Sequence, residues 1–196
     1  MDYVDLLSRR RSIRKFTEEQ ITREALEDIL IAANGAPIGS NRYEDIHISV
    51  VQNRGALDKL SEAAAKRWQD KETMKKIIGN MKRLELSVET YDPFYSAPTV
   101  FFVSHRKQDV QPGIEFSNVA CVTFSMHLAT VNLGLGSVFM WFALESMREI
   151  PALDNTAVLN LPKDFEPLLG LAVGYPDNEI SKRELTAYKM SMNFLR

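Results

Sequence analysis

The sequence predicts an α+β layer fold, in which helices cover a sheet whose strands are scattered along the chain. Two observations carry this prediction. Strand patterns and helix patterns intermingle without a regular strand–helix–strand repeat. The connection over residues 36–45, which joins a helix to a strand, is also short. No internal repeat, linker or low-complexity segment divides the chain, so we expect one domain over residues 1–196.

The composition is that of an ordinary globular protein. The chain has 196 residues, of which 45% are hydrophobic and 26% charged, so it can bury a substantial core. A net charge of −2 argues against general nucleic-acid binding. A single cysteine, Cys121, excludes an intrachain disulfide framework. The N-terminus is acidic and no run reaches the ~20 apolar residues of a membrane span, so we expect a cytoplasmic protein without membrane contact.

The first third of the chain predicts three helices and one strand. Apolar residues within 4–7 indicate a short opening helix that ends at a run of arginines. Thr22 is a candidate N-cap for a second helix, which residues 34–35 (Asn-Gly) end in the left-handed manner. Residues 46–50 alternate apolar and polar side chains, which indicates a strand. A third helix, capped by its first residue, covers residues 53–66.

The middle of the chain alternates helices with apolar strands. Residues 69–90 carry methionines and aliphatic residues at helical spacing among many charges. That pattern indicates either a helix packed on the core or an adaptable cover over a pocket. Residues 114–131 form an apolar helix that we expect at the centre of the fold. Continuous apolar runs predict core strands over 99–103, 137–142 and 168–174, and a short helix is expected over 145–150.

The C-terminal tail, from Asp177 onward, begins polar and ends in an alternating pattern. Its large apolar residues are Tyr188, Met190, Met192 and Phe194. Such a pattern suits an extended segment that pairs with or packs on something else. The tail docks either on its own chain or on the sheet of another subunit, and the residues alone do not decide between these two.

A basic octet, residues 9–16, stands near the N-terminus. Its sequence Arg-Arg-Arg-Ser-Ile-Arg-Lys-Phe places five cations and a hydroxyl beside two apolar residues, Ile13 and Phe16. Forked guanidinium groups match phosphate bidentately, so the octet suits an anion clamp docked on a core. It equally suits an exposed basic end after a short helix, because short basic clusters are weak motifs. Not all five cations can face one ligand, and we expect Arg9 and Lys15 to face solvent.

Signals for catalysis by the protein's own side chains are missing from the sequence. Residues 134–136 (Gly-Leu-Gly) lack the third glycine of a dinucleotide fingerprint and precede a strand rather than a helix. There is no P-loop and no Gly-x-Ser-x-Gly elbow. The three histidines lack metal-ligand spacing, and His127 is expected to be a satisfied core histidine. A cofactor that brings its own chemistry remains, and the arginines offer a place for its phosphate.

Seven short motifs, taken in order, span nearly the whole chain. They are Arg10-Arg11-Ser12-Ile13-Arg14-Lys15-Phe16, Ala32-Ala33-Asn34-Gly35-Ala36-Pro37, Gly39-Ser40-Asn41, Ser96-Ala97-Pro98, residues 128–137, Leu161-Pro162 and residues 171–176, the last followed by a basic pair. Each motif is weak alone, but the ordered set resembles the nitroreductase-like FMN-dependent oxidoreductases. The resemblance implies a nitroreductase-like α+β fold, with a central, mostly antiparallel sheet of four to five strands flanked by helices. It also implies an intertwined homodimer with FMN at its interface.

The resemblance implies which residues would hold FMN. Those expected at the phosphate and the flavin edge are Arg10, Arg11, Ser12 and Arg14, joined from the C-terminal part by Arg183 and Lys182. Those expected to meet the flavin from the second subunit are Pro37, Ile38, Gly39 and Asn41. Met140 and Trp141 occupy the position whose backbone faces the isoalloxazine near N5.

The activity that the resemblance implies is that of an FMN-dependent NAD(P)H oxidoreductase. NADH or NADPH would pass hydride to N5 of FMN, and a nitroaromatic, quinone or similar small acceptor would then take the electrons. Because the flavin carries the chemistry, we expect no catalytic side chain and no metal. The alternative is an FMN-binding storage or sensing protein without physiological turnover.

Two places depart from the family pattern. After Asn41 many members continue Gln-Pro-Trp, whereas this chain reads Arg-Tyr-Glu-Asp over 42–45, which bears on ligand contacts and acceptor specificity. Members often have glycine at the position of Trp141. The indole either narrows the pocket or points into the core, in which case only the backbone serves the flavin.

Overall fold

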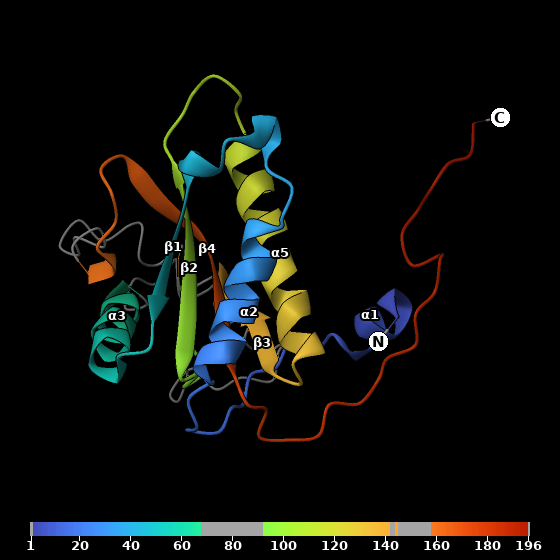
Figure 1. The fold of residues 1–196 in the computed structure, drawn as a ribbon, viewed down its shortest axis with the longest axis horizontal. Coiled ribbons are helices and arrows are strands. Elements are labelled where there is room, and N and C mark those ends of the chain that lie inside the picture. The colour runs from blue at the N-terminus through green and yellow to red at the C-terminus, as the bar shows by residue number, and fades with distance from the viewer. Residues whose placement is uncertain (1, 68–91, 142–143, 145–157, 196) are drawn as a thin grey trace.

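One four-stranded antiparallel sheet forms the centre of the fold (Figure 1). The computed structural model describes residues 2–67, 92–141, 144 and 158–195. The strands are β1 (Ile46–Val51), β2 (Thr99–Arg106), β3 (Gly136–Phe139) and β4 (Phe165–Gly174). Their order across the sheet is β1-β2-β4-β3, and each of the three pairings is antiparallel. The predicted α+β class is therefore confirmed.

Strand β2 is buried on both of its faces, as its continuous apolar run predicts. Phe101 and Val103 pack into the core layer beneath two helices, α2 (Arg23–Asn34) and α5 (Ile114–Asn132). Val100 and Phe102 point to the other side, into the layer that includes residues of α3 (Arg54–Arg67). All four side chains are fully buried. Figure 1 shows the same arrangement, with α2 and α5 on one side of the sheet and α3 on the other.

The helix ends follow the sequence signals, with one exception. Helix α1 (Tyr3–Arg9) runs into the basic octet, and the Thr22 side chain caps α2. The prediction that α2 ends in the left-handed manner is wrong, because Gly35 has φ −83° and ψ −4°. The N–H of Ala36 donates to the carbonyl of Ala33, which closes the helix with a tighter right-handed turn. Pro37, which has no N–H, follows immediately.

Helix α3 begins after Asn53, whose side chain accepts from the first turn, as predicted. Strand β3 stops at Phe139, short of the predicted end at residue 142, and Trp141 already has helical backbone. Between them the Met140 N–H still donates to β4. The helices predicted over 69–90 and 145–150 lie outside the described residues. Among the helices that the structure describes, none is both long enough and apolar enough to cross a membrane.

The C-terminal tail extends away from the sheet of its own chain, past α1 (Figure 1). Its apolar residues lie in water: Tyr188 is 80% exposed, Met190 79% and Phe194 70%. Among the described residues the tail therefore has no apolar surface to cover it, and the interpretation in which it docks on its own chain is not what the structure shows there.

Candidate functional site

Backbone hydrogen bonds attach the basic octet to one end of the sheet. The N–H of Ile13 donates to the carbonyl of Ser137 in β3 at 3.0 Å, and the N–H of Thr17 donates to the carbonyl of Tyr175 at 2.9 Å. The N–H of Asp177 donates in return to the carbonyl of Lys15 at 3.2 Å. The octet is thus docked beside β3 and the exit of β4, so its side chains project in defined directions.

Two glycines receive the apolar side chains of the octet. A Cβ built on Gly136 would lie 2.9 Å from the Cβ of Ile13, too close for any larger residue without a shift. A Cβ on Gly174 would lie 3.1 Å from Cδ1 of Phe16. These two close contacts set the register of the octet against the sheet. The octet is therefore a docked segment and not a free basic end.

The chain beyond β4 brings a distant cation to the octet. The N–H of Arg183 donates to the carbonyl of Ser8 at 2.9 Å, and its Nε donates to the carbonyl of Leu7 at 3.4 Å. Arg183 thereby lies near Arg10. Burial, and then the charges of Arg183 and Arg11, lower the pKa of Arg10. Like charges held together create a positive patch that favours a bound anion.

Asp5, in α1, pairs with two cations that directly precede members of this patch in the sequence. Asp5 pairs with Lys182, and its Oδ2 lies 3.0 Å from Nε of Arg9. Hydrogen bonds from Lys182 and then from Arg9 lower the pKa of Asp5. Lys15 is exposed, as expected, but Arg9 is held by this pair and only 43% exposed. The described residues include no carboxylate that pairs with Arg10, Arg11, Arg14 or Arg183.

Arg14 carries a donor that the described residues leave unsatisfied. Its Nε is buried without a hydrogen-bond partner, while its Nη1 donates to the carbonyl of Ser12 at 3.4 Å. The guanidinium carbon lies 6.0 Å from the centre of the Tyr95 ring. A buried N–H without an acceptor costs free energy, so an acceptor atom from a ligand fits this position.

His127, in α5, supports Arg10 from the side of the core. Nη1 of Arg10 lies 3.0 Å from Nε2 of the imidazole, and Nδ1 lies 2.5 Å from Oγ of Ser137. His127 is only 3% exposed. Burial, and then the charge of Arg10, lower the pKa of His127 to about 4. His127 is therefore a satisfied core histidine, as predicted, although the sequence does not reveal its partners.

The predicted flavin loop lies near the other end of α5 (Figure 1). The N–H of Gly39 donates to Oδ1 of Asn118 at 2.9 Å, and Nδ2 of Asn118 lies 3.2 Å from Nε2 of His105. A Cβ on Gly39 would lie 2.5 Å from Cδ1 of Ile114, so the loop approaches the helix closely. Residues 40–41 follow with positive φ angles of 55° and 58°. No sequence pattern singles out Asn118, because it is one of several polar residues in a largely apolar helix.

Within a single chain, this loop and the arginines are held at separate points along α5. Asn118 holds the loop and His127 holds Arg10, and these two residues are nine positions apart. Nine residues of α-helix span about 13 Å. In the loop, Ile38 is buried in the core, whereas Pro37 and Asn41 are exposed. In one chain the two predicted halves of the site are therefore anchored at different points along α5.

The residues that depart from the family pattern, 42–45, follow the loop directly and are held by ion pairs. Nε of Arg42 lies 2.7 Å from Asp45, and Nε of Arg106, in β2, lies 3.0 Å from the same carboxylate. Burial opposes the ionisation of Asp45, but hydrogen bonds from Arg42 and Arg106 outweigh it and lower its pKa. The guanidinium carbon of Arg106 also lies 4.8 Å from the ring centre of Phe165 in β4. Arg42 is thus engaged by its own chain.

Met140 and Trp141 differ sharply in burial. Met140 is 2% exposed, and a Cβ on Gly170 would lie 2.5 Å from its Cε. Its N–H donates to the carbonyl of Gly170 at 2.9 Å, so that N–H is already engaged. Trp141 is 52% exposed. The interpretation that places the indole in the core is therefore wrong, and the one in which it narrows a pocket stays a prediction.

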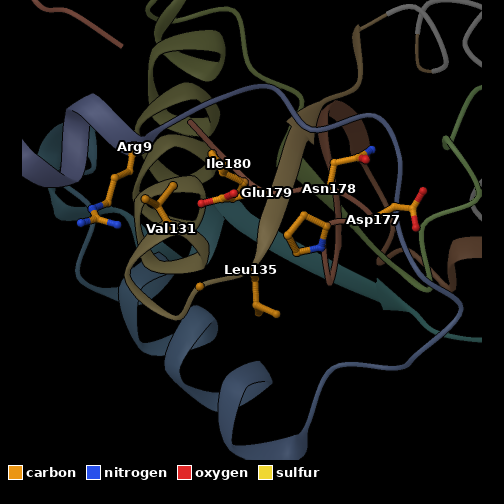
Figure 2. Close-up of a pocket in the computed structure, with 9 residues that line it drawn as sticks. Arg9, Val131, Leu135, Asp177, Asn178, Glu179 and Ile180 are labelled. Carbon is orange, nitrogen blue, oxygen red and sulfur yellow. The ribbon is translucent and has the colours of Figure 1, made fainter. Parts of the chain in front are cut away.

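A cavity of about 450 Å³ lies beside the octet (Figure 2). The end of α5, the turn into β3 and the chain after β4 form its walls, and Arg9 from α1 lines it too. Its lining residues are Arg9, Val131, Gly134, Leu135 and residues 176–180. Arg10, Arg14 and Arg183 do not line this cavity, so the positive patch is separate from it.

Comparisons with known proteins find relatives and solved structures that match nearly the whole chain. The FMN reductase (NAD(P)H) of Bacillus subtilis is 26% identical over 189 residues, which cover 93% of this chain and 69% of the relative. An iodotyrosine deiodinase of Haliscomenobacter hydrossis is 25% identical over 191 residues, which cover 89% of this chain and 79% of the relative. The crystal structure of a nitroreductase with bound FMN from Bacteroides fragilis superposes with a TM-score of 0.80 at 24% identity, covering 99% of this chain and 100% of that one.

The family model supplies the broadest match. The model of the Nitroreductase family matches residues 7–175, from α1 through the end of β4. That range includes the octet, the loop held by Asn118 and all four strands. The fold likeness to the Bacteroides fragilis structure agrees with it. The chain belongs to the nitroreductase family.

Proposed function

We propose that the protein is an FMN-dependent NAD(P)H oxidoreductase that reduces a nitroaromatic, quinone or similar small acceptor. The observation that carries the proposal is the gathering of Arg10, Arg11 and Arg183 from opposite ends of the chain into one positive patch. The names of the relatives, an FMN reductase and a nitroreductase with bound FMN, support FMN as the anion.

The residues of the patch fit a phosphorylated flavin. Arg10 and Arg183 would hold the phosphate, because guanidinium groups bind phosphate through paired hydrogen bonds. Arg14 lies further along the docked octet, and its buried Nε would meet an acceptor on the flavin edge. Ser12 is exposed beside β3 and would add a hydroxyl, while Arg11 adds positive charge. Lys182 is held by Asp5, so it would not bind the phosphate directly.

FMN, when bound, supplies the hydride transfer between a nicotinamide and the acceptor. The residues of this chain contribute binding, orientation and charge. The cations of the octet favour a dianion and stabilise negative charge that develops next to them. Trp141 follows the end of β3 with its indole half-exposed, where it would restrict which acceptors approach. No step in this scheme requires an acid or base from the chain.

We also propose that two copies of the chain build each site. In one chain Asn118 holds the Gly39 loop and His127 holds Arg10 at points about 13 Å apart along α5, so the loop of a second copy would meet the flavin bound at Arg10. The exposed apolar tail supports the same arrangement, because the described part of its own chain does not cover it. Each chain would act as one domain, residues 1–196, around its single sheet.

The proposal is tested with the purified full-length protein. We expect a flavin absorbance spectrum, either as isolated or after addition of FMN, and oxidation of NADH or NADPH with a quinone or nitroaromatic acceptor. The deiodinase relative makes iodotyrosine a third acceptor worth including. A folded protein that takes up no FMN would contradict the proposal. Tight FMN binding without turnover on any acceptor would instead favour a storage or sensing role.

A further inference from the structure

A closed chain of hydrogen bonds lies behind Arg10. Nη1 of Arg10 is 3.0 Å from Nε2 of His127, and Nδ1 of His127 is 2.5 Å from Oγ of Ser137. That hydroxyl lies 2.6 Å from Oγ1 of Thr130, which donates to the carbonyl of His127 at 2.8 Å. His127 and Ser137 are 3% and 1% exposed, and Thr130 is fully buried. The chain of bonds is therefore shielded from water up to Arg10.

Because residue 10 is an arginine, the donor and the acceptor of each bond in this hydrogen-bond chain can be assigned. A guanidinium only donates, so Nε2 of His127 must accept and the ring proton must sit on Nδ1. Nδ1–H then donates to Ser137, whose own proton goes to Thr130, since Thr130 donates to the carbonyl of His127. Every bond in this hydrogen-bond chain then has one donor and one acceptor. One tautomer of His127 is thus fixed from both sides.

The imidazole meets the cation without cancelling its charge. Arg10 is the charged group that contacts the ring, and Arg183 and Arg11 act on Arg10 from beyond it. From β3 the ring meets the Ser137 hydroxyl and the ring of Phe139, whose centre is 5.4 Å away. A neutral acceptor in this place holds a guanidinium and leaves its positive charge for an anion. A carboxylate would hold it too, but would neutralise it.

We propose that His127 is a positioning residue that aims Arg10 at the phosphate of FMN. It engages one of the five guanidinium N–H groups and leaves four for the ligand. Its own orientation is fixed by Ser137 and Thr130, and it stands on α5, a rigid element beneath the sheet. The inference rests on the proposed function, because it concerns the same site. It adds a residue that touches neither the flavin nor the acceptor.

Two substitutions at one position separate positioning from packing. In His127→Gln the amide oxygen reaches the place of Nε2 and can accept from Arg10. In His127→Asn the shorter amide reaches only the place of Nδ1, so it can still donate to Ser137 but does not reach Arg10. Apoprotein of the full chain is titrated with FMN and with riboflavin, which lacks the phosphate, and flavin fluorescence reports binding.

We expect His127→Gln to bind FMN within about threefold of the wild type, and His127→Asn to bind it about tenfold or more weakly, the value of one charge-assisted hydrogen bond. Riboflavin affinity should not change in either variant. In the Arg10→Ala background the same two substitutions should have no effect on FMN, because the group that they position is gone.

The outcomes distinguish failure of this inference from failure of the proposed function. A wild-type protein that binds neither flavin overturns the proposed function, and this inference with it. A wild type that binds FMN, next to a His127→Asn variant of equal affinity, overturns this inference alone. Parallel loss of FMN and riboflavin in both variants also overturns it, since that result indicates a packing role.

Discussion

Arg183 lies close enough to Arg10 that its charge, after burial, lowers the pKa of the Arg10 guanidinium. The single chain holds them there through the backbone of α1, because Arg183 is hydrogen-bonded to the carbonyls of Ser8 and Leu7. Such a pair repels itself until an anion arrives. The free energy of holding the two cations together would be recovered when a phosphate binds between them.

Removing either cation should weaken FMN binding selectively. Each charge-assisted contact to phosphate contributes about 1.5–3 kcal/mol, so Arg10→Ala or Arg183→Ala should weaken FMN about 10- to 100-fold. Lys182→Ala is the matched control. Its ammonium is held by Asp5, so we expect less than about a threefold change. Titration of apoprotein at fixed ionic strength measures all three, and an unchanged FMN affinity in Arg183→Ala would reject the clamp.

The stability of the fold should depend on pH through His127. Its pKa falls from an ordinary 6.5 to about 4 in the folded protein. Between these values the unfolded chain binds the proton and the folded chain does not, so stability is full above pH 6.5 and declines as the pH falls toward 4. The decline should reach about 3 kcal/mol.

Urea unfolding at pH 7, 5.5 and 4.5 measures this dependence, with His127→Gln as the control that lacks the titrating group. The titration of Asp45 does not contribute to the change in the free energy of unfolding between pH 7 and 4.5. Its pKa is lowered, so its contribution is lost only as the pH falls below the ordinary carboxyl value of 3.8. Equal slopes for wild type and His127→Gln between pH 7 and 4.5 would contradict the assignment.

Gly136→Ala should loosen the octet. The new methyl group would lie 2.9 Å from Cβ of Ile13, and overpacking of this kind costs about 1–3 kcal/mol. Adding Ile13→Ala should restore part of that loss, because it removes Cγ2 and Cγ1 of Ile13, which would lie 2.8 and 3.1 Å from the new methyl group, and leaves only the contact with Cβ. Gly55→Ala in α3 is the control, where the nearest atom would be 3.4 Å away and helix propensity favours alanine. Unfolding midpoints compare the wild type, Gly136→Ala, Ile13→Ala, their double variant and Gly55→Ala, and strict additivity at 13 and 136 would be the contrary result.

Asn118→Ala should disturb the loop at Gly39 and leave the arginines in place. It removes the acceptor of the Gly39 N–H and the neighbour of Nε2 of His105, two buried groups. We expect a loss of about 1–3 kcal/mol in stability. Ser117→Ala, one residue earlier on the exposed side of α5, should cost little. Hydrogen exchange at the Gly39 amide reports the local effect, and full protection of that amide in Asn118→Ala would refute it.

Removing the tail should dissociate the proposed dimer into monomers. A chain that ends at Arg183 keeps the clamp but lacks Tyr188, Met190 and Phe194, which are largely exposed in the single chain. Light scattering on a sizing column should show a dimer for the full chain and a smaller species for the shortened one. The double substitution Tyr188→Asp and Met190→Asp should act in the same direction. A shortened chain with undiminished dimer affinity would leave the tail without this role.

Most of the fold could be predicted from local patterns. The continuous apolar run of β2 indicates burial on both faces, and Thr22 and Asn53 mark helix starts because capping is a local interaction. The end of α2 could not be predicted in detail. Gly35 permits both left- and right-handed turns, and the bond from Ala36 to Ala33 selects the second.

The residues of the candidate site also divide into those that a local sequence pattern reveals and those that it does not. The octet is visible in the sequence because its cations are adjacent, whereas Arg183 is brought beside it only by hydrogen bonds to α1. Asn118, Thr130 and Ser137 give no signal, because a buried polar residue in an apolar helix or strand has its meaning only through its partner. The contact of His127 with Arg10 joins residues that are 117 positions apart, so no local pattern contains it.

Helix α5 is a single continuous rod, and side chains on its buried face hold both the Gly39 loop and Arg10. A rod of this kind does not bend between two anchor points about 13 Å apart, so a displacement at one anchor is felt at the other. In the proposed dimer the loop would serve the neighbouring copy's flavin while Arg10 serves its own. Occupancy of one flavin site would then be communicated mechanically to the other, and the affinities of the two FMN molecules would not be independent.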